Sequence, residues 1–244
     1  MEHIAIFSGN ESRWLAPLLA ALAVHEQPMQ VISAPVGGRL DEALAGLAPL
    51  GFTGVLIEDE GYQRAAADKI GRLEVEAREA GIVDVAKVQF GELQGNYLLP
   101  KVVKQAMEQS GFAGARVLWL GPALPGLRDA LRLATKVHVM SSGPVEGEAF
   151  LEKLSPRQRG LAVLDKTQAQ ALASEVDLVF YNGGPLPLSL LQPYHGLFAF
   201  KEPQQDAYMI VDQVISPVYF RQLYLSRLLG WVSGVDLPPE DFVE

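Results

Sequence analysis

The sequence predicts an α/β protein of two domains, and three observations lead to this prediction. Short apolar runs alternate with amphipathic helical patterns along most of the 244 residues. The order of strand, glycine turn and helix appears as two series, one before residue 100 and one after it. A chain of this length holds one large or two modest domains. We therefore expect an N-terminal α/β domain over residues 1–100 and a doubly wound parallel sheet over residues 101–215.

In the first domain, two predicted helices, WLAPLLAALAV and RLDEALAGLAPL, separate three predicted strands. The apolar runs that predict parallel strands, covered on both faces, are HIAIF at 3–7, MQVIS at 29–33 and TGVLI at 53–57. Residues 63–80 predict one or two helices that end at Gly81, and residues 83–90 predict another strand. Residues 91–97 read as a polar turn. Pro100 then opens a helix, because its missing N–H costs nothing in the first turn.

The second domain repeats the pattern of strand, turn and helix, which is typical of a doubly wound sheet. The predicted strands are ARVLWLG at 115–121, KVHVM at 136–140, GLAVL at 160–164 and DLVFY at 177–181. The predicted helices are LPGLRDALRLA at 124–134, VEGEAFLEKL at 145–154 and TQAQALASE at 167–175. An amphipathic helix at 217–231 and a short helical segment from Pro238 close the chain.

Composition and charge exclude several classes of function. Hydrophobic residues make up 49% and charged residues 20%, which is the balance of an ordered globular protein. The net charge of −9 and the lack of a basic run argue against a nucleic-acid partner. The apolar stretch 14–24 is too short for a membrane span, so we expect no membrane partner and a cytoplasmic location. With no cysteine and four scattered histidines, we expect no metal site.

Several segments match one known scaffold in the same order. They are RLDEALAGLAPLGFTGVLIEDEGYQRAAADKIGRLEVEAREAGIVDVAKV, GELQGNY, VLWLGPALPGLRDAL, DLVFYNGG and the C-terminal helix with Gln222. Over nearly the whole chain, this order resembles the shikimate and quinate dehydrogenase family. The resemblance implies a substrate domain, a Rossmann-like domain for NADP or NAD, and C-terminal helices at 216–244 that return to the first domain.

The resemblance also assigns the catalytic positions. It places Tyr62 where the family has its catalytic lysine, and Leu99 where the family has the partner aspartate. Oxidation of an alcohol requires its O–H proton to leave, and a leucine cannot exchange a proton. Tyr62 is therefore the remaining catalytic candidate, although no lysine neighbours it in sequence. The alternative is a loop tyrosine that packs its ring.

The resemblance implies a substrate pocket and a cofactor loop that have both changed. Trp14 and Ala16 stand in place of two serines, Asp84 stands in place of an asparagine, and Gln222 is retained. The loop from Gly121 to Gly126 reads GPALPG, in which two prolines supply no N–H to a pyrophosphate. Ser141 and Ser142 end the following strand and bring no charge to a ribose.

These replacements favour a shikimate dehydrogenase-like protein without that activity, acting as a small-molecule-binding or interaction module. The alternative is an active NAD(P)-dependent oxidoreductase that uses Tyr62 on another substrate, so the sequence leaves open whether the chain is an enzyme. A third hypothesis is a cation site at Glu58, Asp59, Glu60 and Asp84, although acidic turns are usually solvated. We expect this acidic cluster to repel shikimate and quinate. The sequence leaves open the ligand and whether the chain forms a homodimer.

Overall fold

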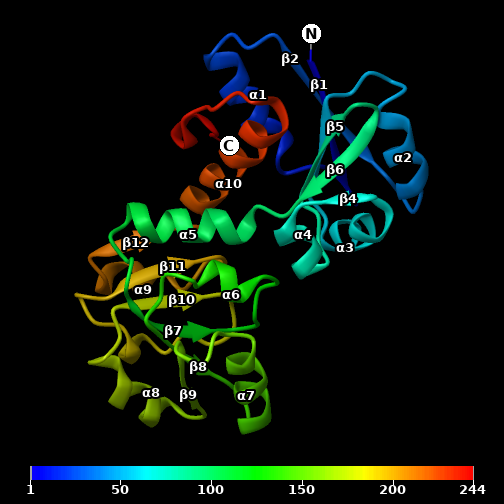
Figure 1. Cartoon of the computed structure of the whole chain (residues 1–244). Helices are drawn as coiled ribbons and strands as arrows, with labels where there is room; N and C mark the ends of the chain where they lie inside the picture. Colours follow the sequence, from blue (N-terminus) through cyan, green and yellow to red (C-terminus); the bar gives the residue numbers. More distant parts are fainter. Residues whose placement is uncertain (1, 244) are drawn as a thin grey trace. The chain divides into compact units, whose positions relative to one another are not determined.

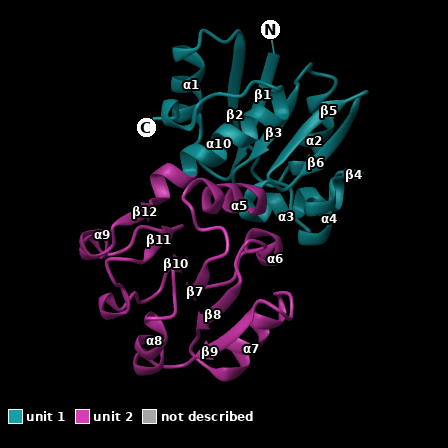
Figure 2. Cartoon of the chain, turned by 60° about the vertical axis from the view of Figure 1, so that its left-hand side comes forward, with its two compact units in different colours: residues 1–99, 221–244 teal, residues 100–220 magenta. Residues whose placement is uncertain are grey.

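The computed structural model describes residues 2–243 and contains two six-stranded sheets with helices (Figure 1). This architecture confirms the predicted α/β class. The chain divides into two compact units (Figure 2): unit 1 comprises residues 1–99 and 221–244, and unit 2 comprises residues 100–220. No helix among the described residues is long and apolar enough to cross a membrane.

Unit 1 contains a mixed sheet with strand order β2-β1-β3-β5-β6-β4. Strand β1 pairs in parallel with β2 and β3, whereas β5 is antiparallel to both β3 and β6. The elements are β1 (Glu2–Ser8), α1 (Leu15–Val24), β2 (Met29–Pro35), α2 (Leu40–Leu47), β3 (Gly54–Ile57), α3 (Glu60–Lys69), β4 (Arg72–Leu73), α4 (Val75–Ala80), β5 (Val85–Gln89) and β6 (Glu92–Asn96).

The segment predicted as a polar turn at 91–97 is strand β6, so that prediction was wrong. The turn itself is the residue pair Phe90 and Gly91, both at positive φ, which suits a two-residue hairpin. Strand β6 is polar because it lies near the sheet edge, paired over only two residues with the short strand β4. Hydrophobic periodicity alone does not reveal a half-exposed strand of this kind.

One face of the unit 1 sheet is buried by α2, α3 and α4. On α2, Leu40, Leu44 and Leu47 follow helical spacing and pack into this core. The C-terminal helix α10 (Pro217–Ser233) also packs on β3, since a Cβ at Gly54 would collide with Val232. Gly54 therefore lets this helix lie close to the strand. The short 3₁₀ turn η2 (Pro239–Asp241) follows α10.

Unit 2 contains an all-parallel sheet with strand order β12-β11-β10-β7-β8-β9. Numbered within the unit, this is the order 6-5-4-1-2-3 of a doubly wound dinucleotide-binding fold. The elements are α5 (Leu99–Gln109), β7 (Arg116–Leu120), α6 (Leu127–Ala130), β8 (Lys136–Met140), α7 (Pro144–Glu152), β9 (Arg159–Val163), α8 (Lys166–Ala173), β10 (Leu178–Tyr181), η1 (Leu188–Leu190), β11 (Gly196–Ala199), α9 (Gln205–Ile210) and β12 (Gln213–Ile215).

Two features of unit 2 differ from the sequence prediction. Strands β11 and β12, which are four and three residues long, were not predicted. The helix expected over 124–134 is reduced to the four residues of α6, which begins after Gly126 in a left-handed conformation. The core of the sheet is aromatic: Trp119 stacks on Phe180, and Phe180 stacks on Phe198, with ring centroids 5.2 and 4.6 Å apart.

Candidate functional site

Unit 2 has a crevice of about 420 Å³ at the carboxyl ends of its central strands. The loops after β7, β8 and β10 line it, with Gly121, Ser141, Ser142 and Gly183 among the lining residues. Strands β7 and β10 are neighbours from which the chain winds in opposite directions, so the crevice lies at the topological switch point. Ligands of doubly wound sheets bind at this place. The crevice is therefore the candidate ligand site of unit 2.

Contacts with other residues of unit 2 hold the loop after β7 in place. Gly121 has φ +97°, and a Cβ there would lie 2.7 Å from the carbonyl oxygen of Gly183, so only glycine allows this close approach. The indole N–H of Trp119 donates to the carbonyl oxygens of Gly121 and Pro122, at 3.1 Å each. The Asn182 side-chain amide also donates to the Pro122 carbonyl, at 2.9 Å.

The same loop offers little to a pyrophosphate. Dinucleotide folds bind this group with backbone N–H groups at the start of a helix. Here Pro122 and Pro125 have no N–H, and α6 has four residues, so its dipole is small. The side chain of Lys201 packs over Gly183, which lines the crevice. The loop therefore presents few backbone N–H groups to a pyrophosphate.

The loop after β8 carries a negative charge that sequence reasoning missed. Ser141 donates its hydroxyl to the carbonyl of Gly143 at 3.0 Å, whereas Ser142 donates both its hydroxyl and its backbone N–H to Glu146. These hydrogen bonds lower the pKa of Glu146. Glu146 lies in the first turn of α7 and lines the crevice. The signal in the sequence was a serine just before a helix start with a glutamate in its first turn.

In unit 1, the resemblance placed the catalytic lysine position at Tyr62. This residue lies in the first turn of α3, where the carboxylate of Asp59 caps the helix by accepting the Tyr62 backbone N–H at 3.2 Å. The ring is partly buried against the core of unit 1. Within residues 2–243, the Tyr62 hydroxyl makes no hydrogen bond. The structure thus shows no partner that activates it.

The neighbouring acidic residues do not form one cluster, which corrects the sequence expectation. Glu58 accepts hydrogen bonds from the Ser12 hydroxyl at 2.7 Å and from the Arg13 backbone at 3.1 Å, and it also meets the Arg13 guanidinium. Glu60 pairs with Arg64 at 2.7 Å on the exposed side of α3. Among the described residues, no three histidine, aspartate or glutamate side chains could share a metal ion.

Asp84 is completely buried in unit 1. One carboxyl oxygen, Oδ2, accepts the Tyr224 hydroxyl at 2.7 Å and the backbone N–H groups of Leu98 and Leu99 at 2.7 and 3.1 Å. The other oxygen, Oδ1, has no hydrogen-bond partner in the part of the chain that the structure describes. Burial raises the pKa of Asp84 to about 7, although these three hydrogen bonds oppose the shift.

The other predicted pocket residues of unit 1 lie in different surroundings. Trp14 is buried, with its ring edge-on to Tyr224 and the centroids 5.8 Å apart. Ala16 is exposed and lines a separate hollow of about 540 Å³ together with Ser12 and other residues of the loop after β1. Gln222 is half-buried on α10. Tyr224 contacts both Trp14 and Asp84, so these two predicted pocket residues lie near each other. Leu99 also reaches Asp84, but only through its backbone N–H, and its side chain has no reactive group.

No protein-family model matches the chain, and no curated protein matches its sequence, but solved structures do. Shikimate 5-dehydrogenase from Listeria monocytogenes, in complex with shikimate and NAD, has a TM-score of 0.80 at 13% identity, covering 99% of this chain and 94% of that one. The chain has the shikimate dehydrogenase fold. Shikimate dehydrogenase from Thermus thermophilus, in complex with NADP(H) and shikimate, has a TM-score of 0.76 at 18% identity, covering 99% and 97%.

A third similar structure has a different activity in its name. Ligand-free 5-ketofructose reductase of a Gluconobacter species has a TM-score of 0.80 at 14% identity, covering 99% of this chain and 96% of that one. Solved structures with this fold are therefore named as enzymes of different substrates. Fold alone does not decide the substrate, so function must be argued from the residues of the site.

Proposed function

We propose that the chain is a small-molecule-binding protein on the shikimate dehydrogenase fold that does not oxidise shikimate with NADP. The observation that carries this proposal is the pair of residues at the proton-transfer positions. Tyr62 has a hydroxyl without an activating partner, and Leu99 contributes only a backbone N–H, which is already bound to Asp84. Proton transfer by positioned groups accelerates such reactions by roughly 10²- to 10⁴-fold, and this pair cannot supply it.

The crevice of unit 2 supports a ligand other than NADP. A dinucleotide requires N–H groups at a pyrophosphate, and NADP adds a 2′-phosphate that needs a positive partner. The loop from Gly121 to Gly126 is poor in N–H donors, and the carboxylate of Glu146 lines the crevice beside the loop after β8, where it would repel a phosphate. We infer that the crevice takes a neutral or cationic small molecule, and that NADP and NAD bind weakly.

The first prediction concerns activity. The purified chain is expected to show no shikimate-dependent reduction of NADP at neutral or alkaline pH, measured by absorbance of the reduced nicotinamide. A steady-state rate that disappears in Tyr62→Phe would instead establish the alternative, an oxidoreductase that uses this tyrosine. A rate that survives Tyr62→Phe would also overturn the proposal and would place the proton transfer on another residue.

The second prediction concerns cofactor choice and is tested by calorimetric titration with NADPH and NADH. Because Glu146 carries a negative charge beside the crevice, Glu146→Gln is expected to strengthen NADPH binding by roughly tenfold. The control is Glu148→Gln on the same helix, an exposed glutamate that does not line the crevice. Micromolar NADPH binding by the unmodified chain would contradict the inference, as would equal effects of Glu146→Gln and Glu148→Gln.

A further inference from the structure

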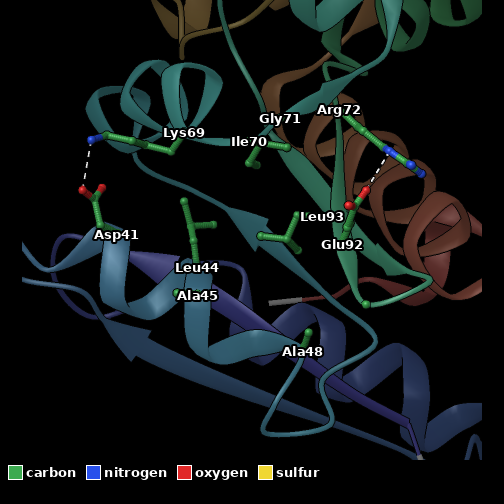
Figure 3. A pocket seen from close by; sticks show the side chains of 11 residues that line it. Asp41, Leu44, Ala45, Ala48, Lys69, Ile70, Gly71, Arg72, Glu92 and Leu93 are labelled. Atoms are coloured by element: carbon green, nitrogen blue, oxygen red, sulfur yellow. Dashed lines mark hydrogen bonds and ion pairs between the residues drawn. The ribbon is translucent and has the colours of Figure 1, made fainter.

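Unit 1 has a groove of about 760 Å³ between α2, the end of α3 and β6, which we name the α2–β6 groove (Figure 3). Its apolar wall includes Leu44, Ile70 and Leu93. One ion pair stands on each side in Figure 3: Lys69 with Asp41 at 3.0 Å, and Arg72 with Glu92 at 2.8 Å. The groove therefore offers apolar surface bordered by both signs of charge.

An exposed aromatic residue stands beside this groove. Phe90 precedes Gly91, which lines the groove, and together they form the turn between β5 and β6. The Phe90 side chain is 93% exposed, and its backbone has φ +55°, a conformation that asparagine or glycine adopts at lower cost. Phe90 thus carries both an exposed apolar ring and a strained backbone. Neither feature helps the hairpin to fold.

We propose that the α2–β6 groove and Phe90 form a self-association surface, in which Phe90 of each copy enters the groove of a second copy. One face carries both a projecting ring and an apolar hollow, and a two-fold axis pairs these elements twice. Aromatic residues at the centre of an interface contribute much of its binding energy. The proposal does not depend on the function proposed for the chain.

The charges around the groove favour a second copy over a strongly acidic or basic partner. Each ion pair presents one cation and one anion, so a partner of uniform charge gains as much repulsion as attraction there. A second copy related by a two-fold axis brings the same two ion pairs, and its cations can lie opposite the anions of the first copy. The net charge of −9 on each chain opposes association at low salt. We therefore expect dimerisation to strengthen when salt is raised moderately.

The association is tested on the full chain by sedimentation velocity over a wide concentration range. Phe90→Asn is expected to weaken dimerisation by at least about tenfold, while asparagine keeps the turn because it tolerates positive φ. Ala45→Gln, at an exposed helical position that lines the groove, is expected to weaken dimerisation as well. The control Met209→Gln removes another highly exposed apolar side chain, on α9, and is expected to leave dimerisation unchanged.

The absence of cysteine allows a test of where the copies meet. Phe90→Cys and Ala45→Cys chains are mixed and oxidised, and a disulfide between them requires Cα atoms within about 7 Å. A cross-linked heterodimer is expected for this pair and not for Met209→Cys mixed with Ala45→Cys. A chain that stays monomeric at every concentration overturns the proposal. A dimer that neither Phe90→Asn nor Ala45→Gln weakens, and that gives no such cross-link, also overturns it.

Discussion

Replacing Asp84 by asparagine is expected to abolish a loss of stability that the unmodified chain shows between about pH 4 and pH 7. Burial raises the pKa of Asp84 from 3.8 to about 7 in the folded chain. In this pH window the unfolded chain has released the proton and the folded chain has kept it. The folded state therefore binds more protons, and the free energy of unfolding falls as pH rises.

The size of this effect follows from the pKa shift. One pKa unit corresponds to about 1.4 kcal/mol, so a shift of about three units amounts to roughly 4 kcal/mol between the two ends of the window. Below pH 4 both states hold the proton and the penalty is absent; above pH 7 it is fully present. Asparagine keeps an oxygen that can accept from Tyr224, Leu98 and Leu99, but it has no charge to bury.

The measurement is urea unfolding at a series of pH values for the unmodified chain and for Asp84→Asn. The control is Asp68→Asn, which removes an exposed carboxylate from α3. Tyr224→Phe removes a hydrogen bond that holds the Asp84 pKa down, so the loss of stability should extend to higher pH. If the unmodified chain and Asp84→Asn show the same pH profile, Asp84 does not titrate in this window.

Replacing Gly121 by alanine is expected to destabilise unit 2 by roughly 3 kcal/mol or more, since it combines backbone strain with a backbone collision. Its φ of +97° is costly for any residue with a side chain. The added Cβ would lie 2.7 Å from the carbonyl oxygen of Gly183 and 2.8 Å from the carbonyl carbon of Asn182. Both atoms belong to the backbone after β10, so neither can rotate away.

The effect of Gly121→Ala is measured by urea unfolding at constant pH. Gly143→Ala is the matched control, because Gly143 also lies beside the crevice but has an extended backbone and no atom within 4 Å of an added Cβ. We expect Gly143→Ala to change the free energy of unfolding by less than about 1 kcal/mol. Comparable losses in the two variants would show that the loop after β7 relaxes and that the contact with Gly183 is not needed.

Local sequence patterns predicted the elements that have a strong period or a clear boundary. The apolar runs of β1, β3, β7 and β10 were found because strands buried on both faces are continuously hydrophobic. Strand β6 was missed because its residues are polar, and α6 was predicted too long because an apolar pattern continues past Leu131 as a buried turn. In both cases contacts with the rest of the fold, and not the local hydrophobic pattern, determine the secondary structure.

The candidate site was predictable only where chemistry depends on residue type. A proline without an N–H and a leucine without a proton are recognised in the sequence itself. Glu146 was missed because its position beside the crevice depends on a turn that brings it to Ser142. The acidic residues of 58–60 looked like one cluster because they are adjacent, but their side chains point to three different partners.

The sequence by itself determined the α/β class, the two series of strands and helices, and the absence of a lysine and an aspartate from the expected catalytic positions. These depend on periodicity and residue type, which are local properties. Only the tertiary structure decided that Asp84 is buried beneath Tyr224, a residue 140 positions away, and that an anion borders the crevice. Burial and charge partners arise from residues distant in sequence, and they set the pKa values and hydrogen bonds on which function depends.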